Sequence, residues 1–215
     1  MQRRTRGSIF VISAPSGAGK TTLGNKIIEK EENLKASVSF TTRRPRKGEI
    51  NDQDYSFVSD GVFRKMIERG EFAEWAEVHG NLYGTSKKRL RGLMRSGFDV
   101  ILDIDTQGAR QIRDSFPEGV FIFILPPSME VLRDRLEKRK GSDPKEDTDI
   151  DRRLRRAVDE IKEAMRDLRG QKMYDYVIVN DVLNDSLRKL DAIITAERVN
   201  ISKIDPKWIK ENFLS

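Results

Sequence analysis

A glycine-rich segment near the N-terminus has the residue types and spacing of a phosphate-binding loop. Residues 14–21 match the pattern GxxxxGK[ST], except that Ala14 stands at the position of the first glycine. Gly17 and Gly19 permit backbone conformations that turn successive amide groups toward one anion, and Lys20 adds a charge for β- and γ-phosphates. The residues expected to bind a triphosphate are Ala14, Pro15, Ser16, Gly17, Ala18, Gly19, Lys20 and Thr21.

Two acids at the end of an apolar run could supply a metal ligand. Asp103 and Asp105 follow this run, and a carboxylate beside a phosphate loop in a parallel sheet can hold Mg²⁺ or its waters. The alternative is that one acid caps a helix that starts near Gln107. Both can hold, one for each aspartate. We predict Thr21 and Asp103 as the residues that bind Mg²⁺, and the division of roles between the two acids stays open.

The spacing of apolar residues predicts the elements that position these groups. Runs rich in β-branched and aromatic residues predict buried strands, and segments with helical spacing lie between and after them. The predicted strands are 8–12, 98–104, 120–125 and 174–179, and the predicted helices are 20–31, 129–139, 150–168 and 186–198. A strand before the glycine-rich segment and a helix after it support the phosphate-loop interpretation over a chance match. The alternation predicts an α/β fold with parallel strands and flanking helices.

Two stretches interrupt this alternation. Residues 39–95 contain short strand-like pieces, a brief helical stretch at 62–67 and several turn signals, which predicts an inserted subdomain. The segment 141–149 is polar, contains Pro and Gly, and predicts a mobile loop between two arginine-bearing helices. We predict one domain over residues 1–215, with a core of 7–38, 96–127 and 155–200, an insert of 39–95 and a mobile lid of 128–154.

The composition limits the possible functions. No cysteine occurs among the 215 residues, which excludes disulfides and thiolate chemistry and fits the cytoplasm. The apolar stretch after the basic N-terminus is too short for a signal peptide or a membrane span, so we expect no membrane attachment. A net charge of +6 favours an anionic partner or simply provides a solubilising surface, and charge alone cannot choose between the two. We expect no nucleic-acid partner, because no known binding motif for one is present.

Several separate blocks of sequence, in order and with their spacing, resemble the guanylate kinase family of P-loop kinases over nearly the whole chain. The blocks are residues 13–20, 39–46, 48–49 with 54–55, 71–75, 81–85, 101–105 with 107–108, and 177–181. The resemblance implies a phosphate-loop core, a GMP-binding insert and a lid. It also implies that ATP and GMP, and dGMP as well, are the substrates, with Mg²⁺ as cofactor. The chain departs from the family pattern in its lid loop, which is longer and acidic.

The resemblance also implies roles for individual residues. It places Arg43, Arg46, Tyr55 and Tyr83 at the GMP phosphate, and it places Ser39, Glu74, Thr85 and Asp105 at the guanine side of the pocket. It places Asn180 near the adenine of ATP. The residues implied to neutralise charge on the transferring phosphoryl group are Lys20, Arg43, Arg135, Arg139 and Arg153.

Elementary chemistry agrees with these implied roles. Two arginines and two tyrosine hydroxyls suit a phosphate dianion, although a basic loop such as 43–46 would more often be only a solvated surface. A carboxylate at Glu74 can accept from both guanine N1–H and the exocyclic amino group, whereas adenine offers neither donor there. The attacking oxygen of GMP is already ionised, so no general base is required, and we expect His79 to be structural or exposed.

Three alternatives remain at the level of sequence. A non-catalytic guanylate-kinase-like binding module tends to lose the phosphate-loop lysine and the lid arginines, which this chain retains. A kinase for a ribose phosphate would lack the nucleobase pocket, and Glu74 and Tyr83 argue against it. A nucleic-acid binder has only the basic charge in its favour. The sequence leaves a monomer and a homo-oligomer equally open.

Overall fold

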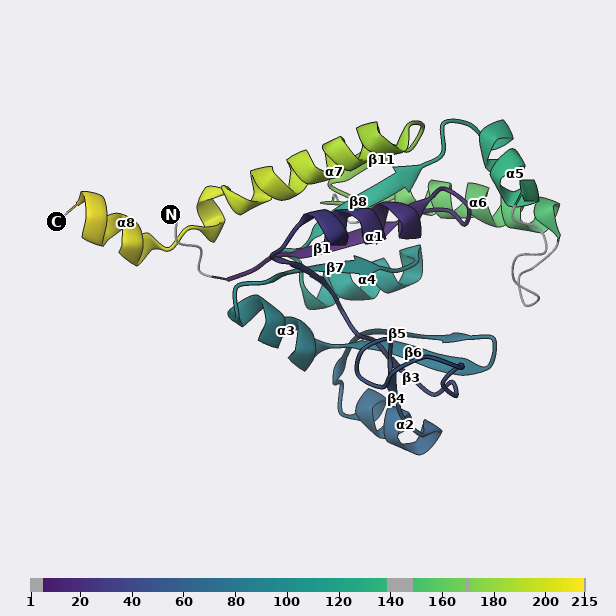
Figure 1. The fold of residues 1–215 in the computed structure, drawn as a ribbon, viewed down its shortest axis with the longest axis horizontal. Coiled ribbons are helices and arrows are strands. Elements are labelled where there is room, and N and C mark those ends of the chain that lie inside the picture. The colour runs from purple at the N-terminus through teal and green to yellow at the C-terminus, as the bar shows by residue number, and fades with distance from the viewer. Residues whose placement is uncertain (1–5, 139–148, 169–170, 215) are drawn as a thin grey trace.

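The computed structural model describes residues 6–138, 149–168 and 171–214. Its centre is a five-stranded parallel sheet with strand order β11-β8-β1-β7-β2. The sheet lies between helices, as Figure 1 shows, and this confirms the predicted α/β class. The strands are β1 (Ile9–Ser13), β2 (Leu34–Ala36), β7 (Asp99–Asp103), β8 (Val120–Leu125) and β11 (Tyr176–Val179).

The central sheet is covered on both faces because its inner strands are apolar on both sides. On one face pack α1 (Lys20–Lys30) and α7 (Leu183–Arg198), and on the other pack α3 (Lys87–Arg95), α4 (Thr106–Ser115) and the end of α6 (Ile150–Ala164). All five residues of β1 are buried. Because β1 is the middle strand, the loop that follows it is anchored in the best-packed part of the molecule.

One strand of the central sheet was not predicted. The strand β2 lies at the edge of the sheet and pairs with β7, and of its three residues only Leu34 is buried. A short edge strand with one apolar residue inward carries no apolar run, so sequence periodicity could not find it.

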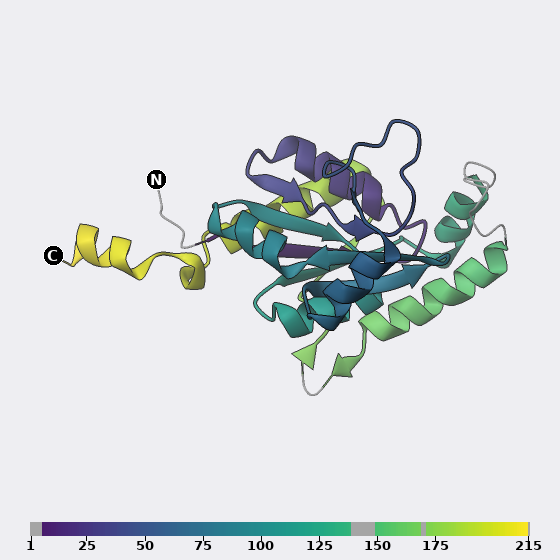
Figure 2. The ribbon, with the colours of Figure 1, turned by 90° about the horizontal axis from the view of Figure 1, so that it is seen from below.

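Within the predicted insert, a second and smaller sheet forms. Its strand order is β4-β3-β6-β5, with β3 (Phe40–Thr41), β4 (Ser56–Phe57), β5 (Phe72–Val78) and β6 (Asn81–Ser86). The helix α2 (Asp60–Glu68) packs on this sheet through Phe63, which is fully buried and stacks on Phe72 with ring centroids 4.4 Å apart. Seen from below in Figure 2, this sheet and α2 lie across the core.

The remaining elements differ in part from the prediction. The helix α5 (Met129–Lys138) lies where a helix was expected, but α6 ends at Ala164 rather than at 168. A short hairpin of β9 (Asp167–Leu168) and β10 (Gln171–Lys172) follows it, so the predicted end of that helix was wrong. At the C-terminus, a 3₁₀ turn (Ile201–Lys203) and α8 (Pro206–Phe213) extend away from the core in Figure 1. In the described ranges, none of the helices is both long and apolar enough to cross a bilayer.

Candidate functional site

The phosphate loop turns between β1 and α1 with the backbone that the motif requires. Gly17 and Gly19 have φ angles of 91° and 94°, a region that favours glycine. A Cβ atom on Gly17 would lie 2.7 Å from a methyl carbon of Leu136 on α5, so a side chain there would also displace that leucine. Ala14 and Ala18 are buried, and the loop tolerates an alanine at position 14.

Lys20, Thr21 and Asp103 meet at the start of α1. Lys20 Nζ lies 2.5 Å from Asp103 Oδ1 and also donates to the backbone oxygen of Ile104 at 2.9 Å. The Thr21 hydroxyl donates to Asp103 Oδ2 at 2.9 Å. The parallel register that pairs Ile12 with Asp103 brings the carboxylate beside the loop. A lysine, a hydroxyl and a carboxylate therefore face one point at the mouth of the phosphate loop.

The structure distinguishes the two aspartates that the sequence left open. Asp105 is the N-cap of α4, where its Oδ1 accepts from the backbone amide of Gly108 at 2.7 Å. Asp103 has no such cap role and instead contacts Lys20 and Thr21. Asp105 also lies near the insert, because its carboxylate and that of Glu74 both approach Gly108. A Cβ atom built on Gly108 would lie 3.3 Å from Asp105 Oδ1 and 3.4 Å from Glu74 Oε2.

Side chains from three other segments close around the phosphate loop. Asn180, after β11, donates from Nδ2 to the backbone oxygen of Ala18 at 2.8 Å. Arg135 on α5 donates to the backbone oxygen of Asn180 at 2.9 Å, and Arg153 on α6 donates to the Ser16 hydroxyl at 2.9 Å. Two of the three predicted lid arginines thus lie against the loop. The third, Arg139, lies outside the described residues, as does nearly all of the predicted mobile loop 141–149.

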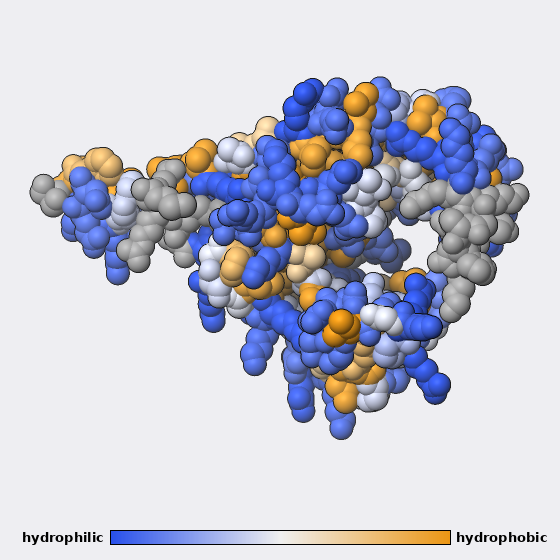
Figure 3. Space-filling view, in the orientation of Figure 1, coloured by the Kyte–Doolittle hydropathy of each residue, from blue (hydrophilic) through white to orange (hydrophobic). Residues whose placement is uncertain are grey.

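A cavity of about 630 Å³ opens over the phosphate loop, which is large enough for a nucleotide. Its wall combines backbone of the loop with cationic and anionic side chains. Those used below are Lys20, Thr21, Asp103, Asp105, Arg135 and Asn180. Figure 3 shows the surface hollowed between the core and the insert.

Across this hollow, the predicted phosphate-binding residues of the insert form a second cluster. The two terminal guanidinium nitrogens of Arg43 donate to the Glu49 carboxylate, at 2.8 and 3.0 Å. Glu49 also accepts from the backbone amide of Arg46 at 2.6 Å, and these contacts lower the pKa of Glu49 to about 2. The Arg43 guanidinium carbon lies 5.4 Å from the centre of the Tyr55 ring, and Tyr55 lies 6.0 Å from Tyr83 between ring centroids. Two arginines and two tyrosines therefore gather at one place.

Glu74 lies deeper, between β5 and α4. Its Oε1 accepts from the Thr85 hydroxyl at 2.5 Å, and Glu74 is buried. Burial raises its pKa, and the nearby Asp105 acts in the same direction, while the hydrogen bond from Thr85 opposes both. A buried carboxylate with one oxygen turned toward Asp105 and Gly108 can accept hydrogen bonds from a flat ligand with adjacent N–H groups.

A smaller cavity of about 190 Å³ is lined by residues of both the core and the insert. Its lining includes Ser39, Tyr55 and Thr85 from the insert side, together with Lys20 and Asp103 from the core. Lys20 therefore lines both cavities. The roles predicted for these residues remain predictions, but the structure places Lys20 and Asp103 with Tyr55 and Thr85 around one cavity.

Two residues in this region were given no role from the sequence. Glu49 pairs with Arg43. In the sequence, the two opposite charges lie six residues apart in a turn-rich loop, and this spacing was the signal that could have indicated the pair. Glu160 on α6 lines the larger cavity, and burial raises its pKa. Only the tertiary packing of α6 could show that this glutamate faces the cavity, because its spacing on an amphipathic helix resembles that of a surface residue.

Comparison with known proteins gives one consistent result. The model of the guanylate kinase family matches residues 6–197. A guanylate kinase of Geobacter metallireducens is 48% identical over 201 residues, which cover 94% of each chain, and one of Caldanaerobacter subterraneus is 43% identical over 98% of this chain and 97% of its own. The crystal structure of guanylate kinase from Anaplasma phagocytophilum is 34% identical and superposes with a TM-score of 0.72, covering 98% of this chain and 97% of that one.

Proposed function

This chain belongs to the guanylate kinase family, and we propose that it transfers the γ-phosphoryl group of ATP to the phosphate of GMP, giving ADP and GDP. The observation that carries the proposal is the position of Lys20, which lines both the cavity over the phosphate loop and the smaller cavity beside Tyr55 and Thr85. A transferring phosphoryl group must lie between donor and acceptor, and Lys20 is the cation common to both sides.

The residues around the phosphate loop act by position and charge. Backbone amides of the loop and the positive end of α1 face the β- and γ-phosphates, and Lys20 neutralises charge that spreads over the moving group. Arg135 and Arg153 already contact the loop, at Ala18 and Ser16, so both are close enough to share this role. Arg139 has the same proposed role.

The donor set at Thr21 and Asp103 fits Mg²⁺, a hard cation that takes oxygen ligands from one or two protein groups and from phosphates. Among the described residues, no group of three or more His, Cys, Asp or Glu side chains forms a complete metal cage, which agrees with binding together with a nucleotide. When bound, Mg²⁺ supplies charge neutralisation at the phosphates. In this structure, Lys20 and Thr21 both contact the Asp103 carboxylate, which keeps the three side chains together at the proposed Mg²⁺ site.

The insert provides the acceptor. Arg43, Arg46, Tyr55 and Tyr83 are proposed to hold the phosphate dianion, with Arg43 kept in orientation by Glu49. Glu74 is proposed to accept from guanine N1–H and the exocyclic amine, with Ser39, Thr85 and Asp105 beside it. Its contact with Thr85 uses one carboxylate oxygen. The attacking phosphate oxygen is ionised, so the residues need only orient it in line with ATP.

We also propose closure of the lid (128–154) and the insert (39–95) over both substrates, which would exclude water from the transferring group. A small separate cluster supports treating the lid as one body: Leu132, Leu136 and Leu154 pack together between α5 and α6. Use of dGMP and a cytoplasmic location are further proposals, and the second is supported by the absence of cysteine.

The test is a coupled assay with ATP and Mg²⁺ against GMP, dGMP, AMP, CMP and UMP. We expect GMP to be used with the highest kcat/KM and dGMP to follow it. Equal use of AMP would contradict the assignment of the base pocket. Absence of phosphoryl transfer to any of the five would contradict the proposed activity and favour the non-catalytic binding module.

A further inference from the structure

We propose that Arg89 is a positioning residue for the GMP phosphate site, acting from α3 on the turn that carries Tyr55. The inference rests on the proposed function, since it concerns the affinity of the same acceptor site. Arg89 occupies the third position of α3, and the helix begins after Ser86, whose hydroxyl accepts from the Arg89 amide at 3.5 Å.

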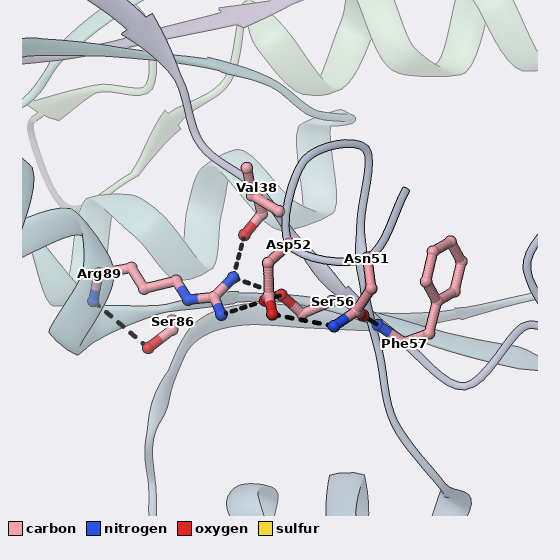
Figure 4. A network of polar contacts seen from close by, with 7 residues as sticks. All are labelled: Val38, Asn51, Asp52, Ser56, Phe57, Ser86 and Arg89. Atoms are coloured by element: carbon pink, nitrogen blue, oxygen red, sulfur yellow. Dashed lines mark hydrogen bonds and ion pairs between the residues drawn. The ribbon is translucent and has the colours of Figure 1, made fainter. Parts of the chain in front are cut away.

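The guanidinium of Arg89 links α3 to two other segments, residues 38–40 and the turn 52–56. Figure 4 shows its contacts: Nη1 donates to the Ser56 hydroxyl at 2.5 Å and to the backbone oxygen of Val38 at 3.4 Å, and Nη2 donates to Asp52 Oδ1 at 2.8 Å. The guanidinium carbon also lies 4.3 Å from the centre of the Phe40 ring. A planar group with several donors in fixed directions suits such a junction better than lysine would.

The turn that Arg89 holds contains a residue in an unusual conformation. Asp52 has a φ angle of 62°, in the left-handed region that residues other than Gly, Asn and Asp rarely adopt. Its backbone amide donates to the backbone oxygen of Tyr55 at 2.8 Å, and its carboxylate accepts from both Arg89 and the Ser56 hydroxyl. These side-chain contacts compensate for the less favourable backbone and fix the turn in one conformation.

Fixing this turn fixes the neighbours of two predicted GMP contacts. Ser56 is buried, it follows Tyr55 directly, and its amide donates to the backbone oxygen of Ser39 at 2.9 Å. Val38, whose carbonyl Arg89 contacts, precedes Ser39. The Arg89 guanidinium donates to Val38, Asp52 and Ser56. Its influence on GMP therefore passes through this turn and the residue before Ser39.

This role is separable from a general contribution to stability. The Arg89–Asp52 pair is partly exposed, with side-chain exposures of 35% and 58%, and such pairs contribute little to the free energy of unfolding. The turn, in contrast, can move Tyr55 by a small distance, to which a phosphate contact is sensitive. We therefore expect a change in KM for GMP that is larger than any change in the melting temperature implies.

The first experiment measures kcat and both KM values for Arg89→Met, which keeps the apolar stem over Phe40 but removes the donors. We expect KM for GMP to rise about 10-fold, because the lost charge-assisted hydrogen bonds hold the GMP site. The values of kcat and of KM for ATP should stay within about twofold, because the ATP site keeps its contacts. Arg89→Lys should fall in between. The matched control is Arg91→Met on the same helix, whose guanidinium lies 5.5 Å from the Phe116 ring centre, and it should keep the KM for GMP.

The second experiment tests the path through Asp52. Asp52→Gly removes the carboxylate, and glycine adopts φ 62° without strain, so the backbone cost is avoided. If Arg89 acts through this turn, the double variant with Arg89→Met and Asp52→Gly should show a smaller rise in KM for GMP than the product of the two single rises. Full multiplication of the two effects, an unchanged KM in Arg89→Met, or an equal rise in both KM values would overturn the inference.

These outcomes are distinct from failure of the proposed function. If the unmodified protein transfers no phosphoryl group to GMP, the proposed function is wrong. If it does so and Arg89→Met has the KM of the unmodified protein, only the role of Arg89 is wrong. Should Arg89→Met fold poorly, the comparison of Arg89→Lys with Asp52→Gly decides the question, since an unchanged KM for GMP in both would also overturn it.

Discussion

The two halves of the site are organised by different means. Around the phosphate loop, the main determinants are backbone geometry and a large core, since β1 is buried along its whole length. In the insert, the determinants are ion pairs and hydrogen bonds between side chains, such as Arg43 with Glu49 and Glu74 with Thr85. Among the described residues, the apolar cluster beneath the insert has three buried members, Phe63, Phe72 and Leu82.

The difference indicates which half adapts to its ligand. A backbone nest held by a large core is preorganised and binds the phosphates that nucleotides share. A pocket of paired side chains on a small core can specify one base and can also move when the substrate arrives. Four experiments test this contrast.

The largest effect is expected from Phe63→Ala in the small core. Removing a fully buried phenylalanine that stacks on Phe72 should destabilise the insert by about 3 to 5 kcal/mol. Because the phosphate loop rests on other clusters, GMP binding should be lost while ATP binding is largely retained, as titration calorimetry with each nucleotide would reveal. Val62→Ala, at an exposed position of the same helix, is the control. Equal loss of both nucleotides would mean that the two halves share one core.

The next effect is on turnover. Lys20→Ala removes the cation that lines both cavities, and we expect kcat to fall about 100- to 1000-fold with a smaller change in KM for GMP. Steady-state kinetics measure both constants. Lys26→Ala, an exposed lysine on the same helix, should be unchanged. A Lys20→Ala protein with normal turnover would show that the site is misassigned.

A third change acts on base recognition. Glu74→Gln keeps the shape but leaves one guanine N–H facing a donor, so kcat/KM for GMP should fall about 10- to 100-fold, and the preference over AMP should shrink. Glu77→Gln, on the exposed end of the same strand, is the control. A Glu74→Gln enzyme that discriminates between GMP and AMP as before would place base recognition elsewhere.

The smallest effect is on pH dependence. Burial raises the pKa of Glu74, so its neutral form persists to higher pH than in an exposed glutamate, whereas guanine requires the ionised form. As pH falls through this raised pKa, KM for GMP should increase about threefold beyond the change caused by protonation of the GMP phosphate. Glu74→Gln should lose this component, and identical pH profiles for the two proteins would contradict it. The raised pKa also makes the free energy of unfolding depend on pH. The contribution of Glu74 to stability is present at acidic pH, and it is lost as pH rises through the pKa of the folded state.

Much of this protein was determined by local sequence. The apolar run before residue 14, the glycines at 17 and 19 and the helix after Lys20 predict a phosphate loop, because each feature acts within a few residues of chain. Alternating strands and helices likewise predict the parallel sheet, and β1, β7, β8 and β11 confirm it. The resemblance to guanylate kinases then implied the residues that bind GMP. In the structure, Arg43, Tyr55 and Tyr83 of this set lie close together.

The remaining features depend on tertiary packing, because the contacts that define them join residues far apart in the chain. Nothing near Asp103 or Asp105 in sequence says which one meets Lys20, but the pairing of β7 with β1 does. The edge strand β2 exists through its pairing with β7. Arg89 lies in a basic stretch of sequence, and its contact with Asp52, 37 residues away, depends on how α3 packs beside the turn 52–56. Such contacts follow from the packing of whole elements, which no local pattern encodes.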